Sequence, residues 1–199
     1  MAKLVSRILV VLYVLFCVAY CQKIIFDPAM RPSPATWLIF VVATIMVVVS
    51  YKKAGNGDAL RGRLIFADAI ATWVIFAVII LTSGFVLRFR QFEIGYLLVA
   101  SAIGAFWFFS KNHMVANLLV QALITIGYLP TIHKLLEGTA RTEPLYPWFL
   151  AIGASACGAI LAHLPHEETR ESRTDAILSK VYAWRSLSCA GVVIFLTLR

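Results

Sequence analysis

The chain has 199 residues, of which 61% are apolar and only 14% are charged, a composition outside the range of soluble globular domains. A net charge of +8 would favour nucleic-acid binding in a soluble protein. Here the basic residues lie in short connections between apolar segments, where lysine and arginine determine topology and contact anionic lipid. We therefore predict an all-α integral membrane protein with the lipid bilayer, and not nucleic acid, as its surroundings.

Seven segments are long and apolar enough to form membrane-spanning helices. The predicted spans are 4–26, 35–51, 64–84, 92–110, 113–132, 146–163 and 178–198. The connections are too short to form a separate soluble domain, so we predict a single multi-pass membrane domain over residues 1–199. An odd number of spans places the two termini on opposite sides of the membrane. The larger number of basic residues on the side of Lys3 and Arg7 favours that side as the inner one.

The first span has a second interpretation. Lys3 and Arg7 precede an apolar run, as in a signal peptide, and Ala19-Tyr20-Cys21 would be a poor cleavage site. Against this, Tyr20 begins a pattern that occurs again later in the chain, which favours retention of the segment as a helix.

That pattern is a tyrosine, a basic turn, a proline and a tryptophan, and it occurs at Tyr20–Trp37 and again at Tyr128–Trp148. Two copies indicate an internally repeated membrane protein, in which two three-helix bundles (4–84 and 113–198) flank a linker helix (92–110) in a parallel 3+1+3 arrangement. The alternative is that membrane chains commonly place proline, arginine and tryptophan at interfaces. We include Trp37 and Trp148 among the residues predicted to bind solute.

A proline lies inside the fifth predicted span. Pro130 removes a backbone donor and clashes with the preceding turn, so we predict a kink there. Gln22 occupies the corresponding place in the first copy of the pattern. We assign Pro130 and Gln22 as a pair of hinge positions.

This arrangement resembles the PQ-loop and SWEET-type (MtN3-like) superfamily of seven-helix transporters. The resemblance rests on three short motifs, namely Pro130-Thr131 followed by Lys134, and the Pro-then-Trp helix entries at Pro34/Trp37 and Pro144/Trp148. The family has Pro-Gln where this chain has Pro130-Thr131. The resemblance implies facilitated passage of a small polar solute by alternating access. It also implies an external N-terminus, whereas the distribution of basic residues favours an internal one.

Polar residues recur every fourth position in the fifth span, at His113, Asn117, Gln121 and Thr125. Residues at that spacing lie along one helix face. Polar groups are costly in hydrocarbon and usually face a cavity or a partner. We predict that Asn117, Gln121 and Thr125 line a solute path between the bundles. The alternative is that they form hydrogen bonds between helices.

Two charged residues lie inside predicted spans. Aligning Arg63 with Lys180 gives Asp68 and Arg185 matching depths in the two bundles. An unpaired charge in the membrane is expensive, so we predict that they pair with each other or line the path. The alternative is that each side chain extends to its own membrane interface.

Other chemistry has little support in the sequence. There is no HExxH, GxSxG or P-loop motif, so we predict no enzymatic activity and no cofactor. A cluster at His163, His166, Glu167 and Glu168 could attract a metal, but it lies in a polar loop, so we predict no metal site. The four cysteines have neither zinc-site nor disulfide-framework spacing. Two functions are predicted: a transporter of a small-molecule solute or, alternatively, a non-transporting membrane receptor or assembly factor. A second copy of the chain is a further possible partner.

Overall fold

The computed structural model describes residues 1–27, 30–53, 59–110, 113–138, 143–164 and 170–199, with side chains described except at 51–53, 59–64, 113–114 and 170–179. The regular structure in these ranges is entirely helical, which confirms the all-α prediction. The helices are α1 (Ala2–Phe26), α2 (Pro34–Lys53), α3 (Ala59–Thr82), α4 (Gln91–Phe109), α5 (His113–Leu136), α6 (Leu145–His163) and α7 (Arg170–Leu198).

Six of these helices are long and apolar enough to cross a membrane, namely α1, α3, α4, α5, α6 and α7. In α2 the apolar stretch within the described side chains is shorter, Pro34–Ser50. Many large apolar side chains point outward, as in Leu98 and Phe106 of α4. In a soluble protein such a surface would be a liability, whereas in a bilayer it faces lipid. These helices are consistent with a multi-pass integral membrane protein.

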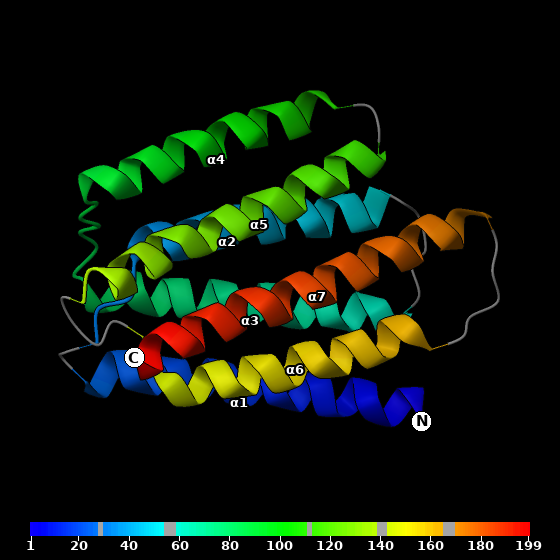
Figure 1. Ribbon diagram of the computed structural model, residues 1–199, viewed down its shortest axis with the longest axis horizontal. Coiled ribbons are helices and arrows are strands. Elements are labelled where there is room, and N and C mark those ends of the chain that lie inside the picture. The colour runs from blue at the N-terminus through cyan, green and yellow to red at the C-terminus, as the bar shows by residue number, and fades with distance from the viewer. Residues whose placement is uncertain (28–29, 54–58, 111–112, 139–142, 165–169) are drawn as a thin grey trace.

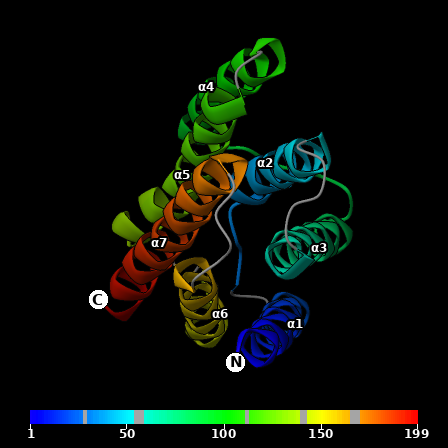
Figure 2. The same ribbon diagram turned by 90° about the vertical axis from the view of Figure 1, so that its right-hand side faces the viewer.

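The helices pack as a ring with one helix outside it (Figure 1). Following the packed neighbours, the order around the ring is α1, α3, α2, α5, α7 and α6, which returns to α1. Helix α4 packs on α5 and more weakly on α2, outside the ring, as the end view shows (Figure 2). The two termini lie at opposite ends of the bundle (Figure 1).

Local sequence explains where several helices begin. Pro34 occupies the first turn of α2, where a missing N–H costs little. Glu93 in the first turn of α4 accepts a hydrogen bond from the Arg90 backbone N–H at 2.9 Å, as in a capping box. Pro144 provides the extended residue that precedes α6. Gly138, just after α5, has a φ of +66°, which glycine adopts without strain.

Three helices differ from the sequence prediction by four residues or more at one end. Helix α3 begins at Ala59 rather than at residue 64. Helix α5 continues past Pro130 to Leu136, beyond the predicted end at residue 132. Neighbouring helices tolerate a proline in this setting, and here Thr131 forms a hydrogen bond with Thr36 of α2. Helix α7 begins at Arg170 rather than at residue 178, because residues that looked like a polar loop continue the helix.

Helix α5 packs closely against α2 at Gly127. A Cβ added to Gly127 would lie 2.6 Å from Cε1 of Phe40 and 3.1 Å from Cγ2 of Ile39. The first distance is shorter than real Cβ contacts, so a larger residue at position 127 would require Phe40 to move. Helices α2 and α5 come from the two halves of the chain, and Gly127 therefore sets how closely the halves meet.

Candidate functional site

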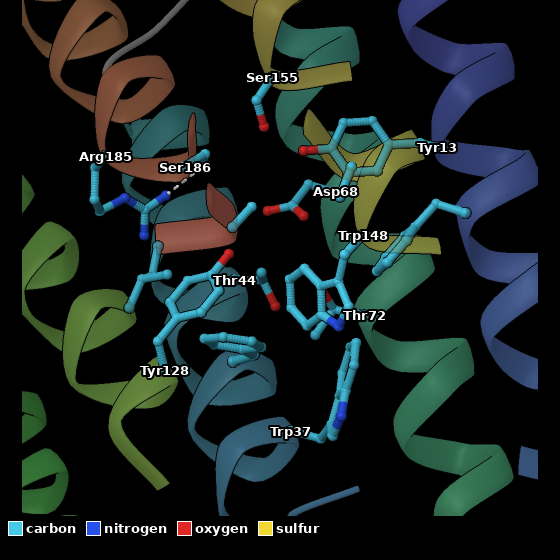
Figure 3. A pocket seen from close by; sticks show the side chains of 15 residues that line it. Tyr13, Trp37, Thr44, Asp68, Thr72, Tyr128, Trp148, Ser155, Arg185 and Ser186 are labelled. Carbon is cyan, nitrogen blue, oxygen red and sulfur yellow. Dashed lines mark hydrogen bonds between the residues drawn. The ribbon is translucent and has the colours of Figure 1, made fainter. Parts of the chain in front are cut away.

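A cavity lies inside the ring, near the middle of its helices (Figure 3). It has about 40 Å³ of space for the centres of water-sized molecules. All six ring helices line it, through Tyr13, Phe16, Trp37, Phe40, Thr44, Asp68, Thr72, Ile124, Tyr128, Trp148, Ala151, Ser155, Arg185, Ser186 and Ala190. A volume of this size holds roughly two to three water molecules. The cavity is therefore small in this structure.

Four of the residues predicted to bind solute meet in this cavity. Trp37 and Trp148 line it from α2 and α6, and Asp68 and Arg185 line it from α3 and α7. These four residues are far apart in the sequence, and the ring brings them together.

Asp68 is held by a tyrosine that the sequence analysis did not single out. The hydroxyl of Tyr182 on α7 donates a short hydrogen bond to Oδ2 of Asp68. The bond joins α3 and α7, one helix from each half of the chain. Tyr13 also forms a hydrogen bond with Asp68. An ionised carboxylate can accept about four hydrogen bonds, so these two leave acceptor capacity unused.

Arg185 has fewer partners than a buried guanidinium normally needs. Its Nη2 donates to Oγ of Ser186 at 3.1 Å, and its Cζ lies 4.6 Å from the centre of the Tyr182 ring. Its Nε and Nη1 are inaccessible to solvent and have no hydrogen-bond partner among the described residues. Buried donors of this kind are expensive when they are left unsatisfied.

The predicted direct ion pair between Asp68 and Arg185 is not formed. Among the described side chains, ion pairs within 4.0 Å join Glu137 to Arg90 and to His133 only. Tyr182 contacts both charged residues, through its hydroxyl for Asp68 and through its ring for Arg185. The two charges therefore share a cavity and a common neighbour without touching.

Aromatic rings form a closed circuit at one end of the cavity. Ring centres are separated by 4.9 Å for Tyr20–Trp37, 5.7 Å for Trp37–Phe40, 4.8 Å for Phe40–Tyr128, 5.9 Å for Tyr128–Trp148 and 6.3 Å for Trp148–Tyr20. These distances are in the range of favourable edge-to-face contact. The circuit takes rings from α1, α2, α5 and α6, so it closes the cavity toward the end of the bundle where α1 ends.

Beyond the aromatic circuit lies a buried carboxylate, Glu143. Its Oε2 accepts hydrogen bonds from Tyr20 Oη at 2.5 Å and from Trp148 Nε1 at 3.0 Å. Its Oε1 accepts one from Thr131 Oγ1 at 3.4 Å, and Thr131 contacts Thr36 Oγ1 at 2.9 Å. Burial raises the pKa of Glu143 to about 7, although its hydrogen bonds and Lys134 act in the opposite direction. We call this end of the bundle the Glu143 end.

The sequence analysis missed Glu143 because it appeared to be part of a polar turn. The one available signal was an acidic residue directly before Pro144, at the start of a helix. Arg141, which the repeated pattern emphasised, lies outside the described residues.

The polar stripe of α5 does not line the cavity. Helix α5 instead presents Ile124 and Tyr128 to it. Gln121 is buried elsewhere with its Oε1 unpartnered among the described residues, and Thr125 donates to the Gln121 carbonyl at 2.9 Å. Residues four apart drift around a helix by about 40° per step, so a long stripe cannot keep to one narrow face. That Asn117, Gln121 and Thr125 bind solute stays a prediction, and the side chain of His113 lies outside the described residues.

The two predicted hinge residues occupy different surroundings. Pro130 is fully buried within α5. Gln22 lies in a groove of about 450 Å³ at the end of α1, formed with Tyr146 and Pro147 of α6. A hinge role for this pair stays a prediction.

The remaining candidates are the His/Glu cluster that could attract a metal and the four cysteines. No group of three or more His, Cys, Asp or Glu side chains with metal-binding geometry occurs in the described part of the chain. The cluster at His166, Glu167 and Glu168 lies outside that part, and Nδ1 of His163 lies 2.8 Å from the Ala159 carbonyl oxygen. All four cysteines are free and half-buried.

Comparison with known proteins gives no match, whether with protein-family models, with curated proteins or with solved structures.

Proposed function

We propose that the protein is a membrane transporter that moves a small polar solute by alternating access between two three-helix bundles. The observation that carries the proposal is the central cavity. It lies near the middle of the ring helices, between the two halves of the chain, and it combines two tryptophans, two charged side chains and several hydroxyl groups. Solute sites of repeat-built transporters lie in such a position, near the midplane at the repeat interface.

A 3+1+3 repeat of seven spans is part of this proposal, and the packing order supports it. The two bundles can be compared by exchanging α1 with α5, α2 with α6 and α3 with α7. Every pair of neighbouring helices around the ring then becomes another pair that also packs. The α1–α3 and α2–α3 contacts become α5–α7 and α6–α7, and the α1–α6 contact becomes α2–α5. Helix α4 lies outside the ring, as a linker between the two bundles would.

The residues that line the cavity support the same exchange. On α2 they are Trp37, Phe40 and Thr44, and at the same spacing on α6 they are Trp148, Ala151 and Ser155. Both triplets begin with tryptophan and end with a hydroxyl. Similarly, Asp68 and Thr72 of α3 correspond to Ser186 and Ala190 of α7. In this alignment Ser186, and not Arg185, is equivalent to Asp68. It differs by one residue from the alignment of Arg63 with Lys180.

The contacts at one end of the bundle also fit alternating access. At the Glu143 end, contacts cross between the bundles, from Tyr20 of the first to Glu143 of the second and from Thr36 to Thr131. Opening that end requires these hydrogen bonds and the aromatic circuit to separate. The proposed likeness to PQ-loop and SWEET-type transporters rests on this architecture and on the Pro-then-Trp helix entries, with the termini on opposite sides of the membrane.

The test is accessibility of the cavity from each side of the membrane. In a chain whose native cysteines are replaced by alanine, Ser155→Cys provides a reporter in the cavity. The pair Thr36→Cys and Thr131→Cys provides a lock, because the two hydroxyl oxygens are 2.9 Å apart across the bundles. A membrane-impermeant thiol reagent is added to one side of sealed vesicles, and modification of position 155 is read by peptide mass spectrometry.

Without the lock, we expect modification from both sides. Oxidation of the lock should stop modification from the Glu143 end while leaving it possible from the other end, and reduction of the same sample should restore it. If the cysteine at position 155 is modified from one side only, both with the lock oxidised and with it reduced, alternating access is contradicted. That outcome would favour the receptor or assembly factor on the same scaffold.

A further inference from the structure

The two charges in the cavity indicate what kind of solute it takes. Asp68 and Arg185 both line the cavity, and each has hydrogen-bonding capacity that the protein leaves unused. Two opposite charges at close range would normally pair. Here Tyr182 lies against both, which keeps one charge available at each side of the cavity.

Arg185 carries the stronger requirement for a ligand. Two of its three guanidinium nitrogens are buried without a partner among the described residues, while the third is held by Ser186 at 3.1 Å. A guanidinium is always charged and its planar donors match the two oxygens of a carboxylate. A ligand carboxylate would satisfy donors that no described side chain satisfies.

Asp68 determines what else the ligand must carry. A simple anion placed against Arg185 would also meet the negative charge of Asp68 in a site of low dielectric, where like charges repel strongly. A ligand that also carries a protonated amine would instead donate to Asp68. A zwitterion therefore meets both side chains with complementary charge, and it adds no net charge to a buried cavity.

We propose that the cavity binds a small zwitterionic solute, with its carboxylate on Arg185 and its protonated amine on Asp68. This inference rests on the proposed transport function, because it takes the central cavity as the solute site. Tyr182 acts as a positioning residue, since it fixes the Asp68 carboxylate. The space of about 40 Å³ restricts the bound solute to a few non-hydrogen atoms unless the cavity widens.

Binding of three matched probes separates the two interactions. L-alanine carries both charged groups, propionate lacks the amine, and ethylammonium lacks the carboxylate. Their affinities are measured at pH 7 by isothermal titration calorimetry on the full chain in lipid nanodiscs. We expect L-alanine to bind at least about tenfold more tightly than either fragment, because one hydrogen bond to a charged group changes an affinity by a factor of this size.

Variants assign each interaction to a residue. Arg185→Gln should weaken binding of L-alanine and propionate by about tenfold or more, with ethylammonium changed less than about threefold. Asp68→Asn should do the reverse, weakening binding of L-alanine and ethylammonium and sparing propionate. Arg90→Gln and Glu137→Gln are matched controls, because their residues form an ion pair at 2.8 Å on the surface, away from the cavity. Both controls should leave all three affinities unchanged.

Two outcomes would overturn the inference. One is equal weakening of all three probes by Arg185→Gln, which would make the residue structural. The other is propionate binding as tightly as L-alanine, which would make the ligand a simple anion. The accessibility test with Ser155→Cys needs no ligand, so a transporter with a different solute would pass it and fail here. A protein that binds the solute without transporting it would fail the accessibility test and pass the binding test.

Discussion

Glu143 and Arg185 are both ionisable groups with buried polar atoms, and their hydrogen bonding is opposite. Glu143 accepts bonds from Tyr20, Trp148 and Thr131, so its requirements are met within the protein. Arg185 leaves two of three nitrogens unpartnered among the described residues. A fully satisfied buried charge holds helices together, whereas an unsatisfied one is a cost that a ligand can remove. We therefore assign closure of the bundle to Glu143 and recognition of the solute to Arg185.

The largest effect on stability should come from removing Glu143. In Glu143→Leu, the buried hydroxyl of Tyr20 and the indole N–H of Trp148 lose their acceptor, which should lower the free energy of unfolding by about 3 kcal/mol. Glu143→Gln keeps a carbonyl oxygen for both donors and should cost only about 1 kcal/mol. Unfolding in a denaturing detergent, followed by tryptophan fluorescence, measures both. Equal losses for the two variants would show that the hydrogen bonds to Glu143 contribute little.

The next effect is a dependence of stability on pH. The pKa of Glu143 is about 7 in the folded protein, against an ordinary value of 4.5. Between these values the folded state holds a proton that the unfolded state has lost, so stability falls as pH rises from about 4.5 to about 7. The full loss above pH 7 should be roughly 3 kcal/mol. Comparing unfolding at pH 5 and pH 8 measures it.

Glu143→Gln is the matched control for that slope, because it cannot titrate. The pair of His133 with Glu137 at 3.3 Å is retained in the variant. The difference between the wild-type and Glu143→Gln slopes therefore isolates Glu143. If both proteins lose stability equally between pH 5 and pH 8, the titrating group is not Glu143.

Most of the helices could be predicted because a bilayer leaves the backbone few alternatives. A long apolar segment must form a helix, so hydropathy located all of them. The ends of α5 and α7 were wrong for local reasons. Pro130 is accommodated by packing against α2, and the polar residues that begin α7 have no bilayer signal to mark them as helical.

The site could be predicted only in part, because it depends on which helices become neighbours. Trp37, Trp148, Asp68 and Arg185 were identified from the repeat and from the cost of charge in a membrane, and all four line the cavity. The role of Tyr182 depends on α3 and α7 meeting across the ring, which no local pattern reveals. Glu143 was missed because burial outside a span cannot be read from hydropathy.

Double-mutant cycles test whether Tyr182 separates the two cavity charges. Asp68→Asn combined with Tyr182→Phe should show a coupling energy of about 2 kcal/mol, since the cycle breaks a direct bond to a charged group. Asp68→Asn combined with Arg185→Gln should show less, about 1 kcal/mol, because those charges do not touch. Both cycles use the same unfolding assay. A larger coupling for the Asp68–Arg185 cycle would restore the direct ion pair as the main interaction.

The smallest effect should come from Arg185→Met, and it separates stability from binding. Methionine fills the space of the arginine side chain without its donors. Loss of the interaction with the Tyr182 ring is offset by removal of two unpartnered buried nitrogens, so the free energy of unfolding should change by no more than about 1 kcal/mol. The same variant should lose L-alanine binding, whereas Glu143→Gln should keep it. If Arg185→Met lowers the free energy of unfolding as much as Glu143→Leu does, Arg185 also holds the bundle together. The assignment of different roles to the two residues would then be wrong.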